Sequence, residues 1–443
     1  MQVIIFLLSI ALLVILITKL RLHAFLSLLL VSLFMGLASG ISPQEVTSTI
    51  ANGFGGIMGY IGIVVVCGVI IGEVLEVTGG AQKIADSILK AVGKKRSAIA
   101  TNLTGAVVSI PVFCDSGFVI LNPIIKAISR VGKIPYMTLV IALMGGLLTT
   151  HAFVPPTPGP LAAAGILGAD IGTVLMYGLI VTVPTSICVI IWATSPYIRR
   201  RFPEIATLDA NDLAREEEFK GVVQNAPSTF LSYMPIVIPI ALIVLQAFTK
   251  SFIDQETILA STLNFFGTPF IALLIGTGFS FLLPSVLNET VTEHWVSNAL
   301  QKSANILLIT AAGGAFGKVL QLVGVGELLG DFILDAGIPV ILVPFMLASV
   351  SVIAQGSATV ALLSTAAIVQ PMLGILGLSP ELTVIAIAAG SFTGVHSNGS
   401  YFWVVSKLAG FDLKKSYIAV TVTTLIMGAS SFATVLAMSF FIS

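Results

Sequence analysis

The segment 150-THAFVPPTPGPLAAAGILGADIG-172 is the most informative part of this sequence about its fold class. It contains four prolines, a histidine and an aspartate, although apolar sequence of membrane-helix character flanks it. Proline inside a helix removes a backbone hydrogen bond and clashes with the preceding turn. In a membrane, backbone freed in this way must be buried in protein or line a cavity. We therefore expect a membrane helix that is interrupted at mid-depth beside a binding site.

The composition predicts an all-α polytopic membrane protein. The chain has 443 residues, of which 56% are hydrophobic and only 9% are charged, and its mean hydropathy is +1.05. Lysine plus arginine equals aspartate plus glutamate, so net charge does not favour a nucleic-acid partner. Apolar windows of about 20 residues mark membrane spans. They lie at roughly 3–18, 24–41, 57–77, 172–194, 229–248, 266–284, 303–323 and 417–441.

Basic residues gather in alternate turns, at 19–23, 94–96, 126–133, 199–201 and 413–415. The positive-inside rule places these turns in the cytoplasm, and we expect a multi-pass protein of a bacterial inner membrane. The hydrophilic segment 199–221 is too short to bury its own core, so we interpret it as a cytoplasmic linker. No metalloprotease motif, nucleophile elbow or paired metal ligands occur in the sequence. We accordingly predict no enzyme activity, no cofactor and no metal site.

The sequence contains a repeat. IGEVLEVTGGAQKIADSILKAVG at 71–93 matches FGKVLQLVGVGELLGDFILDAGI at 316–338. The first copy is basic after residue 78, whereas the second carries three acidic residues and no basic one after residue 323. Opposite charge indicates opposite membrane orientation, and inverted repeats are typical of secondary transporters.

Each half contains two interruptions. Segments 111–120 and 353–362 lie between apolar arms too short to cross, so we predict re-entrant hairpins with tips at 114–117 and 355–358. Segments 150–172 and 394–403 interrupt full-length spans. The resulting division is 1–56 (transmembrane helices), 57–194 (first inverted repeat), 195–228 (linker), 229–302 (transmembrane helices), 303–415 (second inverted repeat) and 416–443 (C-terminal transmembrane helix).

The beginning of each resumed helix suits an anion, because free amide groups and the positive end of the helix dipole meet there. Thr157 is a candidate N-cap with Pro158 at the first helical position. Convergence of four such helix ends predicts a site for a small carboxylate. The candidate substrate-binding residues are Ser116, Gly117, His151, Pro156, Thr157, Gly159, Gly356, Ser357, Thr359, His396, Ser397, Asn398 and Ser400.

Asp115 is the only acidic residue at a predicted hairpin tip, and it is the candidate proton-coupling residue. A carboxylate at the membrane midplane is costly unless it is paired, hydrated or protonated. It could instead accept a substrate hydroxyl or simply cap the following helix. His151 and His396 are candidates for proton carriers or hydrogen-bond donors, and a structural role is nearly as well supported for each.

Two further features have simpler interpretations. Glu73 and Lys318 occupy equivalent positions in the two copies, and snorkelling to the membrane surface explains them better than charge pairs. The glycine-rich segment 53–62 lacks the lysine of a phosphate loop, so close helix packing accounts for it.

Five segments have a distinctive pattern: FCDSGFVILNPI at 113–124, the segment quoted first, ANILLITAAGGAF at 304–316, GSATVALLSTAAIVQPML at 356–373 and SPELTVIAIAAGS at 379–391. They resemble the gluconate permease family, a group of bacterial proton symporters within the ion transporter superfamily. The resemblance runs essentially end to end. It implies two inverted repeats with re-entrant hairpins, a homodimer, and an elevator motion of a transport domain against a scaffold.

The chain departs from the gluconate carriers of that family at three places. Asp115-Ser116-Gly117 stands where those carriers have Glu-Val-Gly, and Thr157 stands where they have histidine. Gly399 replaces an aspartate. These departures concern the identity of the acid more than the class of substrate. From the resemblance we predict uptake of gluconate or a related small sugar acid or hydroxy acid by proton symport. A D-serine-type amino acid carrier and a cation/proton antiporter are the transport alternatives, and an intramembrane enzyme or a receptor is the alternative of another class.

Overall fold

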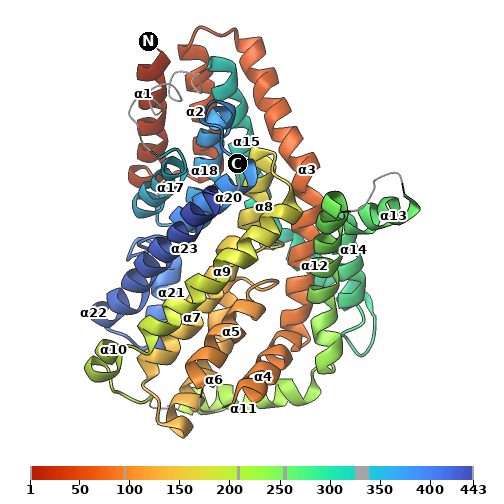
Figure 1. Cartoon of the computed structure of the whole chain (residues 1–443), viewed down its shortest axis with the longest axis vertical. Helices are drawn as coiled ribbons and strands as arrows, with labels where there is room; N and C mark the ends of the chain where they lie inside the picture. The colour runs from red at the N-terminus through yellow and green to blue at the C-terminus, as the bar shows by residue number, and fades with distance from the viewer. Residues whose placement is uncertain (1, 94–95, 207–209, 253–256, 325–338, 442–443) are drawn as a thin grey trace.

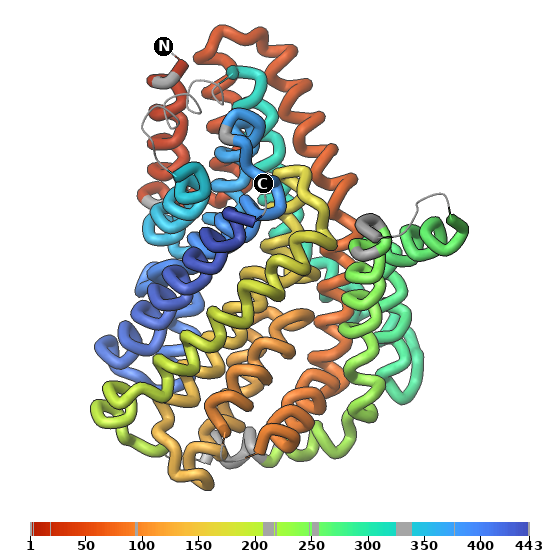
Figure 2. Tube along the Cα trace, viewed as in Figure 1, coloured from red at the N-terminus to blue at the C-terminus, as the bar shows by residue number. Residues whose placement is uncertain are grey.

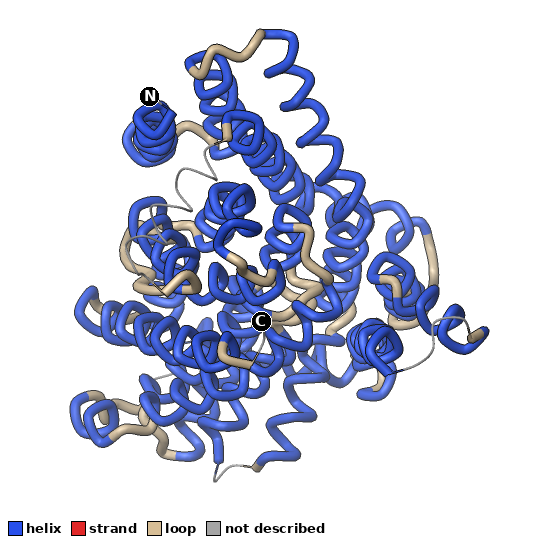
Figure 3. Tube along the Cα trace, turned by 45° about the horizontal axis from the view of Figure 1, so that its top comes forward, coloured by secondary structure: helices blue, strands red, loops and turns tan. Residues whose placement is uncertain are grey.

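The computed structural model describes residues 2–93, 96–206, 210–252, 257–324 and 339–441. Within these ranges the chain forms helices and loops and no strand, as Figure 3 shows. In the described part of the chain, seven helical segments are long and apolar enough to cross a membrane. An eighth results if α13 (Ile258–Gly267) and α14 (Pro269–Ser280), which meet at 64°, count as one bent span. The prediction of an all-α polytopic membrane fold is therefore confirmed.

The elements before the central linker include a long α3, which packs on α2, α4 and α8 (Figure 1). They are α1 (Gln2–Val14), η1 (Ile15–Lys19), α2 (Ala24–Ala38), α3 (Pro43–Val77), α4 (Gly80–Val92), α5 (Ser97–Val108), α6 (Cys114–Gly132), α7 (Tyr136–Phe153), α8 (Pro158–Leu167), α9 (Ile171–Ala193) and α10 (Pro196–Arg201). The predicted linker holds a helix, α11 (Ala210–Asn225), which packs on α4 and α6 at one end of the molecule.

The later helices begin with α12 (Thr229–Phe252), α13 and α14. Then follow η3 (Thr290–Trp295), α15 (Val296–Val323), α17 (Leu342–Gln355), α18 (Ala358–Val369), η4 (Gln370–Met372), α19 (Leu373–Leu376), α20 (Pro380–Ser391), α21 (Ser400–Ala409), α22 (Leu413–Ser416), η5 (Tyr417–Val422) and α23 (Thr423–Ser439). The second copy of the sequence repeat falls largely on 325–338, outside the described residues. The inverted repeat therefore stays a prediction.

The helices α3 and α15 pack side by side in antiparallel directions (Figure 2). Gly53 faces Gly314 and Ala315 near one end of the pair, whereas Glu73 binds Lys302 near the other. With 35 residues, α3 is roughly 52 Å long, which exceeds the hydrocarbon core of a bilayer. The predicted close packing of segment 53–62 is found at Gly53 and not at the other four glycines of the segment, which face open space. They are Gly55, Gly56, Gly59 and Gly62.

Two short helices joined by a turn stand at each predicted hairpin, but one tip lies elsewhere than expected. Their re-entrant course in the membrane stays a prediction. The helices α5 and α6 are joined by residues 109–113, so 114–117 form the first turn of α6 and not the tip. Pro111 has no amide hydrogen to donate to the preceding helical turn, which explains why the chain leaves the helix before residue 114. In the second hairpin the chain turns at Gly356, whose φ of +74° suits glycine, and Ser357 caps α18.

Candidate functional site

A cavity of about 160 Å³ lies where four helices begin. It is lined by the first residues of α6, α8, α18 and α21 together with neighbouring side chains. The lining residues are Phe113, Cys114, Asp115, Leu148, His151, Pro158, Gly159, Ile306, Gly356, Ser357, Ala358, Thr359, Val395, Ser400 and Tyr401. Helix beginnings carry amide groups without intrahelical partners and a partial positive charge. Their convergence gives the cavity a field that favours negative charge.

Asp115 enters this cavity from the first turn of α6. Phe113 occupies the N-cap position, so the alternative in which Asp115 caps α6 is not what the structure shows. The Oδ1 atom of Asp115 is buried and has no hydrogen-bond partner among the described residues. Gly117 brings this turn close to Leu147 of α7, because a Cβ atom there would lie 2.6 Å from the leucine Cδ2.

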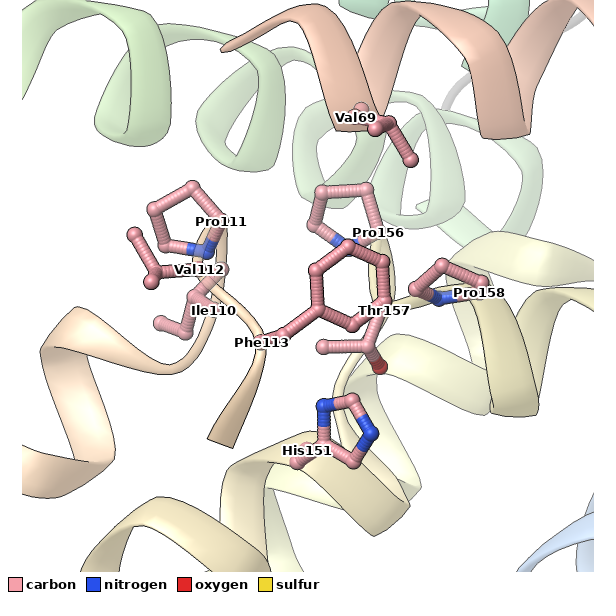
Figure 4. Close-up of a pocket in the computed structure, with 10 residues that line it drawn as sticks. Val69, Ile110, Pro111, Val112, Phe113, His151, Pro156, Thr157 and Pro158 are labelled. Carbon is pink, nitrogen blue, oxygen red and sulfur yellow. The ribbon is translucent and has the colours of Figure 1, made fainter. Parts of the chain in front are cut away.

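His151 lies in the last turn of α7 and lines the same cavity. Its Nδ1 atom is buried without a hydrogen-bond partner in the described part of the chain. Its ring centroid lies 6.1 Å from that of Phe113. Figure 4 shows Phe113 between the hairpin tip and the proline-containing break, with His151 beside it. Only about 10 Å³ of space remains between tip and break, so the two interruptions of the first half lie close together.

Thr157 occupies the predicted N-cap position of α8, with Pro158 next. Its side chain makes no capping bond, however, and its hydroxyl donates to the Val154 carbonyl at 2.7 Å. Thr157 and Pro156 line the narrow gap against Gly68 of α3 and not the larger cavity. We infer that Thr157 stabilises the backbone of the break through this hydrogen bond to Val154.

Three predicted residues of the second break are bound to protein groups. Asn398 Nδ2 donates to the Ile353 carbonyl at 2.7 Å, and His396 Nε2 lies 3.1 Å from the same oxygen. Ser397 Oγ lies 2.9 Å from the hydroxyl of Tyr417. None of the three lines the cavity. They tie the second break to α17 and η5.

The structure thus divides the predicted site residues into two groups. The cavity brings together Asp115, His151, Gly159, Gly356, Ser357, Thr359 and Ser400. Outside its lining lie Ser116, Gly117, Pro156, Thr157, His396, Ser397 and Asn398. Among the lining residues that we did not predict, Tyr401 follows Ser400 directly, whereas Ile306 of α15 carries no sequence signal.

The expectation of snorkelling was wrong for Glu73. This residue is 6% exposed, and its Oε2 accepts a hydrogen bond from Lys302 Nζ at 2.5 Å. Glu76 lies 3.6 Å from the same ammonium group. Lys318 is exposed and donates to Gln321 at 3.1 Å. A buried carboxylate needs a partner, and only helix packing supplies this one.

Comparison with known proteins identifies the family. The sequence profile of the GntP family permeases matches residues 1–441. The chain belongs to this family. It is 34% identical to the inner membrane permease YgbN of Escherichia coli (strain K12), covering 96% of this chain and 95% of that protein. A gluconate permease of Bacillus subtilis (strain 168) is also 34% identical, over 99% of each chain.

Other similarities extend the comparison. The D-serine transporter DsdX of Escherichia coli O6:H1 is 31% identical over 98% of each chain. Among solved structures, the YdaH transporter of Alcanivorax borkumensis has a TM-score of 0.70 at 14% identity, covering 94% of this chain and 98% of that one. The likeness to the YdaH transporter concerns the fold alone. The GntP permease described here is thus a multi-pass inner membrane permease.

Proposed function

We propose that this GntP permease imports gluconate or a related small hydroxy acid together with protons. The observation that carries the proposal is the cavity lined by the beginnings of four interrupted helices. Free amide groups of such helix ends bind anions without a metal or a fixed positive side chain. The gluconate permease among the relatives agrees with a carboxylate substrate, and the D-serine transporter makes a small amino acid the second candidate.

Asp115 is the proposed proton carrier. It is the one acidic side chain of the cavity lining, and its buried Oδ1 atom has no protein partner in the described ranges. A carboxyl group in this position exchanges a proton at lower cost than it bears a permanent charge in the membrane interior. The homodimer implied by the family resemblance is part of the same proposal.

Uptake into proteoliposomes tests the function. An inward-directed proton gradient should drive accumulation of labelled gluconate or glycerate, and a protonophore should abolish it. Accumulation that ignores the gradient contradicts symport, and competition by D-serine alone identifies the amino acid carrier. Proton flux driven by a sodium gradient without organic acid would instead support the antiporter. Exchange of labelled for unlabelled substrate without chemical change separates a carrier from an enzyme.

A further inference from the structure

The four helices that begin at the cavity lead in pairs to two other pockets. In one pair α8 packs on α18, and residues at or just after their far ends line a pocket of about 320 Å³, which we call the outer pocket. In the other pair α6 packs on α21, and both contribute to the inner pocket, of about 300 Å³. Figure 1 shows α8 and α18 above α6 and α21, so the two pockets lie toward opposite ends of the molecule.

The basic segments of the sequence indicate which pocket faces which side of the membrane. Lys126 and Lys415 line the inner pocket, and both belong to segments that the positive-inside rule assigns to the cytoplasm. The outer pocket then faces the periplasm, from which an imported substrate comes. The α8 helix, which is roughly 15 Å long, separates the outer pocket from the cavity at the beginning of this helix.

The outer pocket has the size of a small-molecule site. Its volume falls in the range of about 300–1,000 Å³ that is usual for ligand pockets. Backbone bounds much of the space, because six of its thirteen lining residues are glycine: Gly53, Gly56, Gly165, Gly168, Gly314 and Gly317. These glycines come from α3, α8 and α15, and the absence of their side chains leaves room for a ligand.

Lys318 of α15 gives the outer pocket a positive charge. Its ammonium group donates to the amide oxygen of Gln321 at 3.1 Å, a neutral acceptor that does not cancel this charge. The side chains of Asn52 and Gln370 add amide groups, and no acidic residue occurs in the described lining. The inner pocket differs, because Glu204 binds Lys415 there at 3.2 Å. In the described structure a lysine without a carboxylate in the same lining thus distinguishes the outer pocket from the inner one.

We propose that the outer pocket is a second binding site, which captures the small carboxylate from the periplasm before it reaches the cavity. The Lys318 ammonium group attracts the anion and raises its local concentration. The amide groups of Asn52 and Gln370 are suited to hydrogen bonds with its oxygen atoms. This inference rests on the proposed function and deepens it, because it names where the substrate first binds.

Initial rates of gluconate uptake by the full-length permease in right-side-out membrane vesicles test the proposal. Lys318→Gln should raise KM roughly threefold at low salt, the factor for one charge at about 7 Å in water, without changing kcat. Lys318→Glu should raise KM about tenfold, whereas Lys318→Arg should keep the wild-type value. Salt at about 0.5 M screens the attraction, so it should raise the KM of the wild type and leave that of Lys318→Gln unchanged.

Two comparisons separate capture from other roles of Lys318. In inside-out vesicles the substrate meets the inner pocket first, so Lys318→Gln should keep the wild-type KM there. Lys407→Gln removes an exposed lysine of α21 outside both pocket linings and should change neither KM nor its salt dependence.

Filling the outer pocket provides a test that leaves the charge in place. Gly56→Leu places a side chain in the lining and should raise KM in right-side-out vesicles. Gly59→Leu, one turn further along α3, is the matched control. Nothing lies within 4 Å of an added Cβ atom at either position, and Gly59 is not part of the lining.

The inference is overturned if Lys318→Gln keeps the wild-type KM and salt dependence, or if KM rises equally in both vesicle orientations. A fall in kcat at unchanged KM also overturns it, because Lys318 then acts on the transport cycle and not on capture. A wild-type protein that takes up neither gluconate nor another hydroxy acid overturns the proposed function instead, which separates the two failures.

Discussion

The ammonium group of Lys302 in α15 binds the buried carboxylate of Glu73 in α3 at 2.5 Å. The pair joins the two long helices near the end at which Gly72 meets the tip of the first hairpin. One turn after Lys302, Ile306 lines the cavity. The ion pair therefore joins α3 to α15, a helix that borders the proposed substrate site.

Removal of Lys302 should destabilise the protein more than removal of Glu73. Lys302→Met leaves a carboxylate that is 5% exposed without its partner, which costs about 3 kcal/mol. Glu73→Gln leaves an ammonium group that is 42% exposed and still close to Glu76. Thermal unfolding in detergent should therefore rank the unfolding midpoints as wild type, Glu73→Gln, Lys302→Met, with the double variant above Lys302→Met.

Lys90→Gln is the control for this series, because Lys90 binds Asp86 at 2.6 Å on the surface with its side chain 75% exposed. Such a pair contributes about 0.5 kcal/mol or less. Equal effects of Lys302→Met and Lys90→Gln would contradict the importance of the buried pair.

Gly72→Ala should impair both stability and uptake. An added Cβ atom would lie 2.1 Å from the Pro111 carbonyl oxygen, so the hairpin tip must move. Overpacking of this kind costs about 1–3 kcal/mol, and it displaces the turn that carries Asp115. Gly59→Ala in the same helix is the matched control, because nothing lies within 4 Å of its added Cβ. It should keep full uptake and gain up to about 1 kcal/mol from helix propensity.

Asp115→Asn should uncouple transport from protons. The amide keeps the shape of the side chain but cannot exchange a proton, so gradient-driven accumulation should be lost. Exchange of labelled for unlabelled substrate at equal pH should persist. The measurement is a comparison of these two assays in the same proteoliposomes, with Asp86→Asn as the control. Accumulation by the Asp115 variant at the wild-type level would refute the assigned role.

Asn398→Ala should lower stability without lowering substrate affinity. Its side chain donates to the Ile353 carbonyl and lies outside the cavity lining, so about 1 kcal/mol of hydrogen bonding is lost. His396 Nε2 lies 3.1 Å from the same carbonyl oxygen and still binds it in the variant, which limits the loss of stability. The checks are the unfolding midpoint and the inhibition constant for gluconate. A large loss of affinity would show that Asn398 touches the substrate.

The amino-acid sequence alone predicts the all-α membrane fold, the two helical hairpins and the two broken spans. These features follow from local causes: long apolar windows, prolines that cannot continue a helix, and polar residues inside apolar segments. Five of the fourteen predicted site residues line the cavity for the same reason, because Asp115, Gly159, Ser357, Thr359 and Ser400 mark helix beginnings in the sequence. His151 carried only the signal of a polar ring in an apolar span.

Helix packing determines which of these positions share one cavity. The side chains of His396, Ser397 and Asn398 are bound to α17 and η5, elements distant in the sequence, and no local pattern reports those contacts. The same holds for the contribution of Ile306 and for the partner of Glu73, because both depend on how α15 packs. Hydropathy and helix-breaking residues act within one segment, whereas a binding site in a helical membrane protein is assembled between segments.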